Sequence, residues 1–446
     1  MSANTKRKAN PQEERKVSNN GALYRFSSLN PQTTRFEFGG PWGASALLLV
    51  MPLLTLHFAY ECDGIHSCTF FPELGQMHWT FENLIDYQAI LAYLAWVAYL
   101  IALFHLLPGK SVEGTTLRTG KRLRYKLNGL KTFYTTLGLC AGVVITFGHS
   151  PFLFIPRHFL GIVFASILFS FVVGFLLYAK SFGSQALLAL PGNSGNMVYD
   201  YFIGRELNPR LGDLDLKCFS ELRPGLIGWA LINFSFACQQ YEVMGRVTNS
   251  MILVNLFELW YVFDAIYNEP AILSTMDITS DGFGWMLVCA DYSWVPLNYT
   301  LHTRYLAVYP NDLGAVAMAA ILTLHLGSYY VFRAANSQKH QFRHNPESAD
   351  VQGLKYLQTQ SGSKLLISGY WGVARHINYL ADWTMSFAWS LPCGFGGLCP
   401  YFYPIYFAFL LLHREGRDHE KCHAKYGKDW EKYCKIVKWR ILPGIY

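Results

Sequence analysis

Residues 365–383 read LLISGYWGVARHINYLADW, and residues 413–446 read HREGRDHEKCHAKYGKDWEKYCKIVKWRILPGIY. A hydrophobic stretch separates these two segments, and the second segment contains nine Lys or Arg residues. Aromatic rings, acids and bases are thus concentrated beside apolar runs, which is typical of a binding site. The excess of basic residues predicts that this site binds an anionic cofactor.

The composition points to a membrane protein. Of the 446 residues, 52% are hydrophobic and 15% are charged, whereas soluble proteins carry about 25% charged residues. A helix needs about 20 apolar residues to cross a bilayer, and the last qualifying run is long enough for a two-helix hairpin. We therefore predict an all-α polytopic membrane protein with about ten transmembrane helices. The runs are 41–60, 86–107, 128–148, 158–179, 225–240, 250–267, 284–300, 313–333 and 384–412.

The distribution of basic residues predicts the orientation. The first forty residues are polar and include seven Lys or Arg, with no sign of a cleavable signal peptide. The loop 61–83 has no Lys or Arg, and the loop 108–126 has six. By the positive-inside rule, both termini are expected in the cytosol, and residues 1–36 are expected to form a disordered cytosolic arm. The net charge of +7 then follows from topology and requires no nucleic-acid partner.

Cys62 and Cys68 stand apart from most of the ten cysteines. Most of the others fall in predicted spans or on the cytosolic side, where thiols stay reduced. Cys62 and Cys68 lie in the sequence CDGIHSC, within a loop that the predicted topology places in the lumen. They form either a disulfide or two free thiols near the membrane interface.

Residues 195–229 resist interpretation as a simple linker. The segment, GNMVYDYFIGRELNPRLGDLDLKCFSELRPGLIGW, mixes many charged residues with aromatic ones. Two interpretations remain: a loop that folds back onto the membrane domain, or a structural elbow whose ion pairs hold two helices together.

The run at 250–267 ends in a polar helical face. Tyr261, Asp264, Tyr267 and Asn268 are spaced by three or four residues, which puts them on one side of a helix. Because a carboxylate in a bilayer is costly, Asp264 and the following Glu269 are predicted to line an internal chamber. The alternative is a purely structural ion pair.

The next run, 284–300, contains Pro296, which predicts a break or a kink. Its aromatic residues around Asp291 suit a flat, apolar ligand, and they also suit ordinary helix packing. Farther along, Lys339 and Arg343 are four residues apart. If this segment is helical, the two cations share one face and can clamp phosphates, although solvated charges are the alternative.

Two long motifs resemble the signatures of the sterol reductase family. The first is GNMVYDYFIGRELNPR at 195–210, and the second is LLISGYWGVARHINY at 365–379 with RDHEKCHAKYGKDWEKY at 417–433. The resemblance extends from about Phe38 to the C-terminal LPGIY. It implies a multi-pass enzyme of the endoplasmic reticulum membrane that reduces carbon–carbon double bonds of sterol intermediates with NADPH. The family also includes the membrane domain of the lamin B receptor, which adds a long chromatin-reading arm.

Within this family, the segments 215–229 and 281–306 are most similar to the fungal-type branch that reduces the C14–C15 double bond in sterol biosynthesis of the ergosterol or cholesterol type. Tyr370 stands where Trp or Phe is usual, and Ala381 where Gly is usual. The first change keeps a flat ring. The second adds one methyl group and affects helix packing rather than chemistry.

The resemblance also implies the position of the cofactor site. No GxGxxG motif follows a strand, so a Rossmann domain is not expected. Residues 37–333 are expected to form the transmembrane sterol-pocket region, and 334–446 the NADPH-binding region, with its pocket facing the cytosol. The implied NADPH contacts are Lys339, Arg343, Leu366, Trp371, Asn378, Tyr379, Asp418, Cys422, His423, Ala424, Lys425, Tyr426 and Tyr433.

The expected chemistry is protonation followed by hydride transfer. An isolated alkene does not accept hydride unaided, so an acid must first protonate it and leave a tertiary cation. Tyr433 is the first candidate for the proton donor, held near Arg414 or Arg417 and connected through Asp418. Tyr261 is the second candidate. His413, His419, Cys422, His423 and Cys434 are close in sequence but lack the spacing of a zinc site, so no metal is expected.

Four alternatives compete with this interpretation. A sister-branch sterol reductase would act at C7 or C24(28). An isoprenylcysteine carboxyl methyltransferase has a similar cofactor end but binds S-adenosylmethionine and has a shorter chain with fewer spans. A non-catalytic sterol-binding scaffold would have lost turnover, and a transporter is expected to show an inverted repeat that is not evident here. The expected partners are a membrane-dissolved sterol, the lipid bilayer and other enzymes of sterol biosynthesis.

Overall fold

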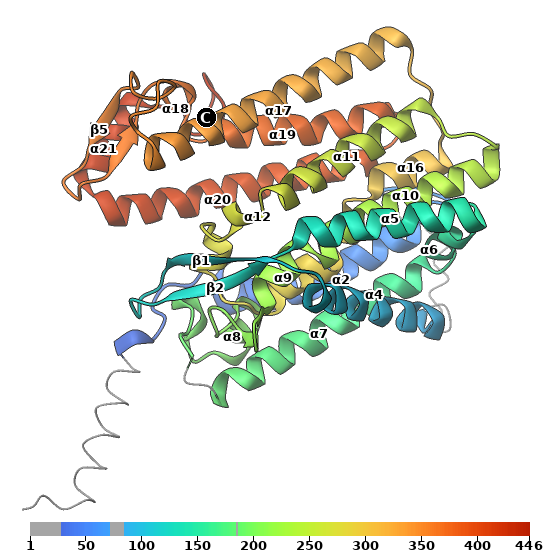
Figure 1. The fold of residues 1–446 in the computed structure, drawn as a ribbon, viewed down its shortest axis with the longest axis horizontal. Helices are drawn as coiled ribbons and strands as arrows, with labels where there is room; N and C mark the ends of the chain where they lie inside the picture. Colours follow the sequence, from blue (N-terminus) through green and yellow to red (C-terminus); the bar gives the residue numbers. More distant parts are fainter. Residues whose placement is uncertain (1–27, 72–83, 184–185) are drawn as a thin grey trace, which may run out of the picture. The chain divides into compact units, whose positions relative to one another are not determined.

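The computed structural model describes residues 28–71, 84–183 and 186–446 and is mostly helical (Figure 1). The chain divides into two compact units. Unit 1 comprises residues up to 60, 76–235 and 260–299, and unit 2 comprises 61–75, 236–259 and 300–446. The predicted regions 37–333 and 334–446 do not coincide with these units and stay predictions about function.

Six helices in the described part of the chain are long and apolar enough to cross a membrane. This number supports a multi-pass helical protein, and it is lower than the predicted ten. The six helices are α2 (Gly40–Glu61), α4 (Tyr87–Leu106), α5 (Gly129–Phe147), α7 (Phe159–Gly183), α11 (Asn249–Tyr267) and α17 (Ala315–His344).

The other predicted spans differ from this set for identifiable reasons. Helix α10 (Pro224–Met244) is long, but its sequence mixes apolar residues with polar ones. The predicted span 284–300 is broken into α14 (Trp285–Cys289), a π-helical turn η3 (Ala290–Trp294) and α15 (Val295–Asn298), as Pro296 suggested. The predicted hairpin 384–412 becomes α19 (Ile377–Ser390) and α20 (Phe402–Tyr426), of which α19 is short and α20 ends in a charged segment.

Three small antiparallel hairpins were missing from the all-α prediction. They are β1 (Lys110–Thr116) with β2 (Arg122–Leu127), β3 (Arg210–Leu211) with β4 (Leu214–Asp215), and β5 (Tyr356–Gln358) with β6 (Lys364–Leu366). The first hairpin turns at Gly120, whose φ of 78° favours glycine. Tyr125 of β2 is buried in a cluster with residues of the elbow that follows, and this contact explains why a polar loop becomes a strand pair.

The elbow between α7 and α10 is held by its own polar contacts. It contains α8 (Met197–Ile203) and α9 (Leu216–Leu222). Asp200 pairs with Arg205 at 3.6 Å and accepts hydrogen bonds from the backbone of residues 194 and 195. The fully buried Lys217 donates to the carbonyl oxygens of Ile278 and Asp281 at 3.1 and 2.7 Å. The structural-elbow interpretation therefore accounts for the charged residues of this segment.

The contacts of Glu269 contradict the prediction that it lines an internal chamber. It lies at the start of α12 (Glu269–Ile272) and was expected to line a chamber. Its carboxylate instead accepts from Arg223 Nη2 and from the backbone N–H of Gly129, each at 2.8 Å. Both side chains of the ion pair are almost completely buried. Glu269 is therefore a structural residue, and the alternative of an ion pair was the correct one.

The predicted polar face on α11 is only partly buried. The side-chain amide of Asn268 donates to the carbonyl oxygen of Asp264 at 2.7 Å and to its carboxylate at 3.3 Å. Tyr267, on the same predicted face, is 62% exposed. The ring of Tyr261 lies 6.0 Å from that of Trp229.

Part of the predicted N-terminal arm is placed by hydrogen bonds. The side-chain oxygen of Asn30 accepts from the backbone of Leu188 at 2.8 Å, and the backbone N–H of Thr33 donates to Asn193 at 2.9 Å. Residues 1–27 of the arm lie outside the described residues.

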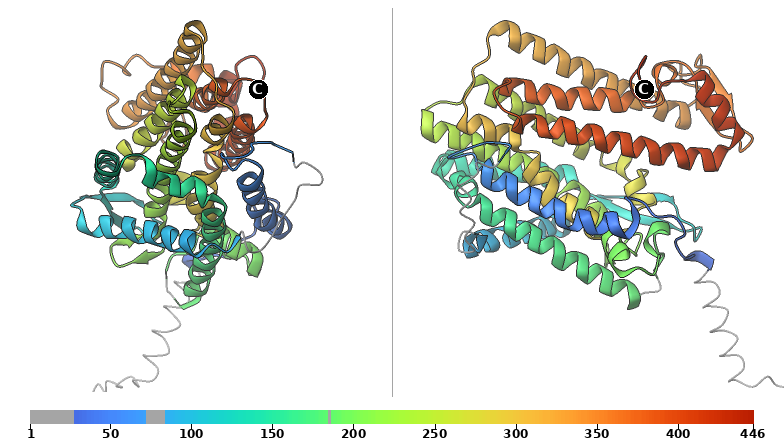
Figure 2. Two further views of the ribbon diagram at one scale, coloured as in Figure 1. Left: turned by 90° about the vertical axis from the view of Figure 1, so that its right-hand side faces the viewer. Right: turned by 180° about the vertical axis from the view of Figure 1, so that it is seen from behind.

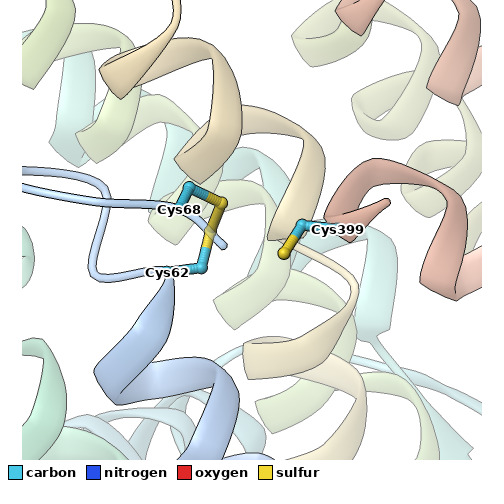
Figure 3. A group of neighbouring side chains, drawn as sticks. All are labelled: Cys62, Cys68 and Cys399. Carbon is cyan, nitrogen blue, oxygen red and sulfur yellow. A yellow bond between two sulfur atoms is a disulfide. The ribbon is translucent and has the colours of Figure 1, made fainter. Parts of the chain in front are cut away.

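In unit 2, Cys62 and Cys68 form a disulfide, which decides the alternative left open by the sequence. Figure 3 shows Cys399 beside this bond, and the three sulfur atoms all lie within 4.8 Å of one another. Arg304, in α16 (Leu301–Val308), donates from Nε to the carbonyl oxygen of Cys62 at 2.7 Å. Because two of the three sulfurs are bonded to each other, they are not available as metal ligands in this state.

The core of the C-terminal region is a layer of three helices. Helix α19 packs against both α17 and α20, and the three run side by side in the views of Figures 1 and 2. The indole N–H of Trp383 donates to the carbonyl oxygen of Pro404, which ties α19 to the first turn of α20. At one end of this layer lie α18 (Tyr370–Val373), α21 (Lys428–Ile436) and the β5–β6 hairpin, all in the orange and red part of the chain.

Candidate functional site

A cavity of about 110 Å³ lies in unit 2 among α17, α18, α20, α21 and β6. This volume is below the range of about 300–1,000 Å³ typical of whole-ligand pockets, so the cavity is large enough for one ring of a dinucleotide rather than for the whole molecule. Its wall carries four Lys or Arg residues and one carboxylate. The lining residues are Lys339, Phe342, Arg343, Lys364, Leu365, Leu366, Trp371, Arg375, His376, Asp418, Cys422, Tyr426, Trp430 and Tyr433.

The C-terminal end of α17 supplies two cations. Lys339 and Arg343 are one helical turn apart and both line the cavity, as their spacing predicted. The ammonium group of Lys339 lies 3.9 Å from the centre of the Trp371 ring. The indole N–H of Trp371 donates to the carbonyl oxygen of Ala335 at 2.8 Å, which fixes the orientation of that ring on α17.

Helix α20 presents Asp418, Cys422 and Tyr426 on one face, because they are spaced by four residues. The thiol of Cys422 lies 3.8 Å from the Asp418 carboxylate. Nε2 of His376 lies 3.6 Å from the same carboxylate. Burial lowers the pKa of His376 to about 4, although Asp418 acts in the opposite direction. The imidazole is therefore neutral near pH 7.

Helix α21 supplies stacked aromatic rings. The rings of Trp430 and Tyr433 stack with their centres 5.0 Å apart, and both side chains are buried in a cluster with Val437. Trp430 also donates from its indole N–H to Nδ1 of His419 at 3.2 Å. Burial raises the pKa of the Tyr433 phenol, and the neighbouring Arg375 guanidinium opposes this rise.

The C-terminal segment holds Arg375 and His376 in the wall. The backbone N–H of Arg375 donates to Trp439 O at 2.9 Å, and that of His376 donates to Arg440 O at 2.8 Å. Arg440 is itself fixed by an ion pair with the buried carboxylate of Glu415 at 2.9 Å. The residues after α21 therefore close the site from one side by backbone hydrogen bonds.

Comparison with known proteins identifies the family. The model of the ergosterol biosynthesis ERG4/ERG24 family matches residues 32–446. The chain belongs to this family. The Delta(14)-sterol reductase erg24 of Schizosaccharomyces pombe is 47% identical over 413 residues, which cover 92% of this chain and 97% of that protein.

Two further similar proteins carry the same name, Delta(14)-sterol reductase. The Delta(14)-sterol reductase of Ascobolus immersus is 44% identical over 92% of this chain and 99% of its own length. The Delta(14)-sterol reductase TM7SF2 of Mus musculus is 44% identical over 92% of this chain and 97% of its own length. The resemblance to sterol reductases, expected from two motifs, is thus confirmed along nearly the whole chain.

Eight of the predicted NADPH contacts lie together around the cavity in unit 2. They share the cavity wall described above, although their roles stay predictions. These residues are Lys339, Arg343, Leu366, Trp371, Asp418, Cys422, Tyr426 and Tyr433.

The remaining predicted residues lie outside that wall. Tyr379 stacks on His376 with the ring centres 4.6 Å apart, and Asn378 donates to Asn336 of α17 at 3.3 Å. His423 lies 3.5 Å from Glu431. Of the other predicted contacts, Ala424 is exposed and the Lys425 ammonium lies 4.9 Å from the ring centre of Tyr426. The second candidate proton donor, Tyr261, belongs to unit 1.

Sequence reasoning missed four polar or aromatic members of the wall, namely Phe342, Lys364, His376 and Trp430. His376 lies inside the quoted motif, and its position between Trp371 and Tyr379 was a usable signal. Lys364 could not be placed because the β5–β6 pairing was not predicted. Arg375 lines the cavity together with Tyr433, whereas Arg414 and Arg417, the neighbours expected for this tyrosine, are not among the lining residues.

Proposed function

We propose that this protein is a Delta(14)-sterol reductase that reduces the C14–C15 double bond of a sterol intermediate with NADPH. The observation that carries this proposal is the shared name of the relatives, each matched over nearly its full length. The cavity in unit 2 supports the same function from geometry, since cations and aromatic rings line one wall.

The residues of the wall fit an anionic dinucleotide. Lys339, Arg343, Lys364 and Arg375 face a single carboxylate, Asp418, so the wall has an excess of positive charge suited to phosphates. Two buried polar atoms near it, Arg375 Nε and Asn378 Oδ1, have no hydrogen-bond partner among the described residues. Trp371, Tyr426 and Trp430 offer flat faces for base or nicotinamide rings.

When bound, NADPH supplies the hydride. The protein must supply the proton, and Tyr433 is our first candidate because it is buried in the wall with aromatic neighbours that tolerate positive charge on the sterol. Asp418 lies in the same wall. We propose that its carboxylate orients the Cys422 thiol and the His376 imidazole, both of which lie close to it. Tyr261 remains the second candidate.

The finer arrangement in the membrane is part of the proposal. We place the protein in the endoplasmic reticulum membrane with about ten spans, both termini in the cytosol and the NADPH pocket facing the cytosol. Residues 37–333 then form the sterol-pocket region and residues 334–446 the NADPH-binding region. The sterol enters from the bilayer, and the product passes to other enzymes of sterol biosynthesis.

An activity assay tests this function. Purified protein in detergent or nanodiscs is given NADPH and a sterol with a conjugated C8,C14 diene, and both NADPH consumption and the reduced sterol are measured. We expect NADPH loss equal to product gain. Absence of NADPH consumption would overturn the proposal.

Two further measurements separate the alternatives. Cells lacking the protein should accumulate C14-unsaturated sterols, whereas C7- or C24(28)-unsaturated sterols would assign a sister branch. NADPH should raise the unfolding temperature, and stabilisation by S-adenosylmethionine alone would indicate a methyltransferase. Ligand binding without turnover would indicate a sterol-binding scaffold.

A further inference from the structure

Arg375 is a buried cation without a carboxylate partner. Its side chain is 7% exposed and lines the cavity. Nη1 lies 3.0 Å from Cys434 Sγ and 3.4 Å from His419 Nδ1, and Nη2 donates to the carbonyl oxygen of Lys438 at 3.2 Å. Nε has no partner among the described residues.

The groups that hold the guanidinium are neutral. Burial lowers the pKa of His419 and raises the pKa of Cys434, so neither group carries a charge near pH 7. A buried charge normally needs a compensating charge. Arg375 is therefore fixed in position by neutral groups and retains its attraction for an anion.

Tyr433 is the neighbour that can become such an anion. Tyr433 directly precedes Cys434, whose sulfur accepts a hydrogen bond from Arg375. The Tyr433 side chain is 5% exposed. Its hydroxyl makes no hydrogen bond within the part of the chain that the structure describes. Loss of its proton would leave a phenolate in a buried site, which is costly unless a positive charge lies nearby.

We propose that Arg375 is a positioning residue for proton transfer, whose guanidinium stabilises the phenolate formed when Tyr433 protonates the sterol. This inference rests on the proposed function and adds a residue that the family motif did not assign to the site. The pKa behaviour agrees with the geometry, since Arg375 opposes the rise that burial causes at Tyr433. Electrostatic stabilisation of developing charge in a water-poor site is an effective catalytic device.

The step balances as follows. The O–H bond of Tyr433 breaks and a C–H bond forms at C15, which leaves a cation at C14. When bound, NADPH would supply the hydride for the second C–H bond, at C14, and would leave as NADP⁺. The phenolate takes a proton from water before the next turnover, and Arg375 does not change its own protonation state.

The test is a double-mutant cycle with Tyr433→Phe, Arg375→Gln and the double variant, measured as kcat at saturating NADPH and sterol. We expect Arg375→Gln to lower kcat by about 10- to 100-fold, because a positioned general acid contributes about 10²–10⁴-fold and only part of that is lost. The dissociation constant of NADPH should rise by a smaller factor than kcat falls, because Lys339, Arg343 and Lys364 still supply positive charge to the cavity wall. In the Tyr433→Phe background, Arg375→Gln should have no further effect, since the two residues act through one another.

The conservative variant separates this role from a structural one. Arg375→Lys keeps a positive charge at this position, so it should recover part of the kcat that Arg375→Gln loses. A purely structural role, which depends on the hydrogen bonds of the guanidinium to Cys434, His419 and Lys438, would be lost in both variants alike. The titratable and charged groups that act on Tyr433 are Arg375, Cys434, Cys422 and Asp418, and Lys339, Arg343, Lys364 and His376 line the same wall.

Controls keep the outcome interpretable. Lys435→Gln, on the exposed side of α21, should leave turnover unchanged. If Arg375→Gln does not fold, as judged by thermal unfolding, the double-mutant cycle is measured with Arg375→Lys in its place. Independent, multiplicative losses in the double variant, or a raised NADPH dissociation constant with unchanged kcat, would overturn the inference. Full turnover by Tyr433→Phe would overturn the assignment of the donor and this inference, whereas loss of all NADPH consumption by the native protein would reject the proposed function itself.

Discussion

The ammonium group of Lys339 lies 3.9 Å from the centre of the Trp371 ring, so a cation of α17 is held against an aromatic face of α18. Trp371 is in turn anchored to α17 by its hydrogen bond to Ala335 at 2.8 Å. The two residues therefore position each other. The ammonium group of Lys339 is thus held at the cavity wall before any ligand binds. A lysine that moved freely in solvent would lose more side-chain entropy on binding a phosphate.

Replacement of Trp371 by Leu removes the aromatic face beneath Lys339. We expect NADPH binding to weaken by about three- to thirtyfold, corresponding to the ~0.5–2 kcal/mol of a cation–π contact. Trp371→Phe should keep most of the affinity because it keeps a ring. Isothermal titration calorimetry measures the effect, with Trp42→Leu, at an 87% exposed position, as the control. Equal affinities of the Leu variant and the native protein would contradict the positioning of Lys339.

Replacement of Arg343 by Ala should mainly raise the NADPH requirement. The guanidinium lines the cavity one turn after Lys339, and a charge-assisted hydrogen bond to phosphate is worth about 1.5–3 kcal/mol, or roughly 10- to 100-fold in affinity. The KM for NADPH should rise accordingly and become less sensitive to salt. Arg246→Ala, which removes an exposed partner of Asp312, is the matched control. A fall in kcat with an unchanged KM would assign Arg343 to the chemistry instead.

Replacement of Glu269 by Gln should destabilise the protein strongly. It leaves the buried Arg223 guanidinium, 1% exposed, without its ion-pair partner, and breaking a buried pair in this way costs about 3–5 kcal/mol. The unfolding temperature in detergent measures the effect. Asp312→Asn breaks the exposed pair with Arg246 and should change that temperature little. The double variant Arg223→Met/Glu269→Leu should recover part of the loss, and a mild effect of Glu269→Gln would contradict the structural role.

His376 should make the protein sensitive to acid. Burial lowers its pKa from 6.5 to about 4 in the folded state, so the unfolded chain binds more protons between these values. The free energy of unfolding therefore decreases as pH falls from about 6.5 to about 4. The stability that the neutral His376 contributes is fully present above about pH 6.5. His376→Gln removes the titrating group and should flatten the pH dependence of the unfolding temperature in that window. An unchanged slope in the variant would show that His376 is accessible to protons in the folded state.

Local patterns predicted the elements that depend on local interactions. The run 158–179 became α7, and the four-residue spacing of Lys339 and Arg343 placed both on one face of α17. Hydrophobic length and helical period are properties of the chain itself, so they can be read without knowledge of tertiary contacts. For Cys62 and Cys68 the predicted topology left a disulfide and two free thiols as alternatives, and the structure shows the disulfide.

Long-range pairings were not predictable in the same way. The partner of Glu269 is Arg223, 46 residues away in the chain, and nothing in the spacing selects it over a chamber. Arg375 lines the same cavity as Tyr433, whereas the expected Arg414 and Arg417 are not among its lining residues. Backbone groups of Trp439 and Arg440 fix residues 375–376 against the tail. Backbone hydrogen bonds of this kind do not depend on side-chain identity and leave no pattern in the sequence.

The chain passes between the two units inside helices α10 and α11, whose residues fall partly in each unit. A gene fragment beginning at Thr300 would encode α17, α19 and α20 but would omit Glu258, which lies 2.8 Å from Nδ1 of His302, and Cys62, whose carbonyl oxygen accepts from Arg304. Such a fragment would lack the buried carboxylate that lies beside His302 and the carbonyl oxygen that accepts from Arg304. The segments before and after Thr300 are therefore expected to fold only as one polypeptide. Co-expression of the two segments as separate chains is expected to give misfolded protein rather than a working enzyme.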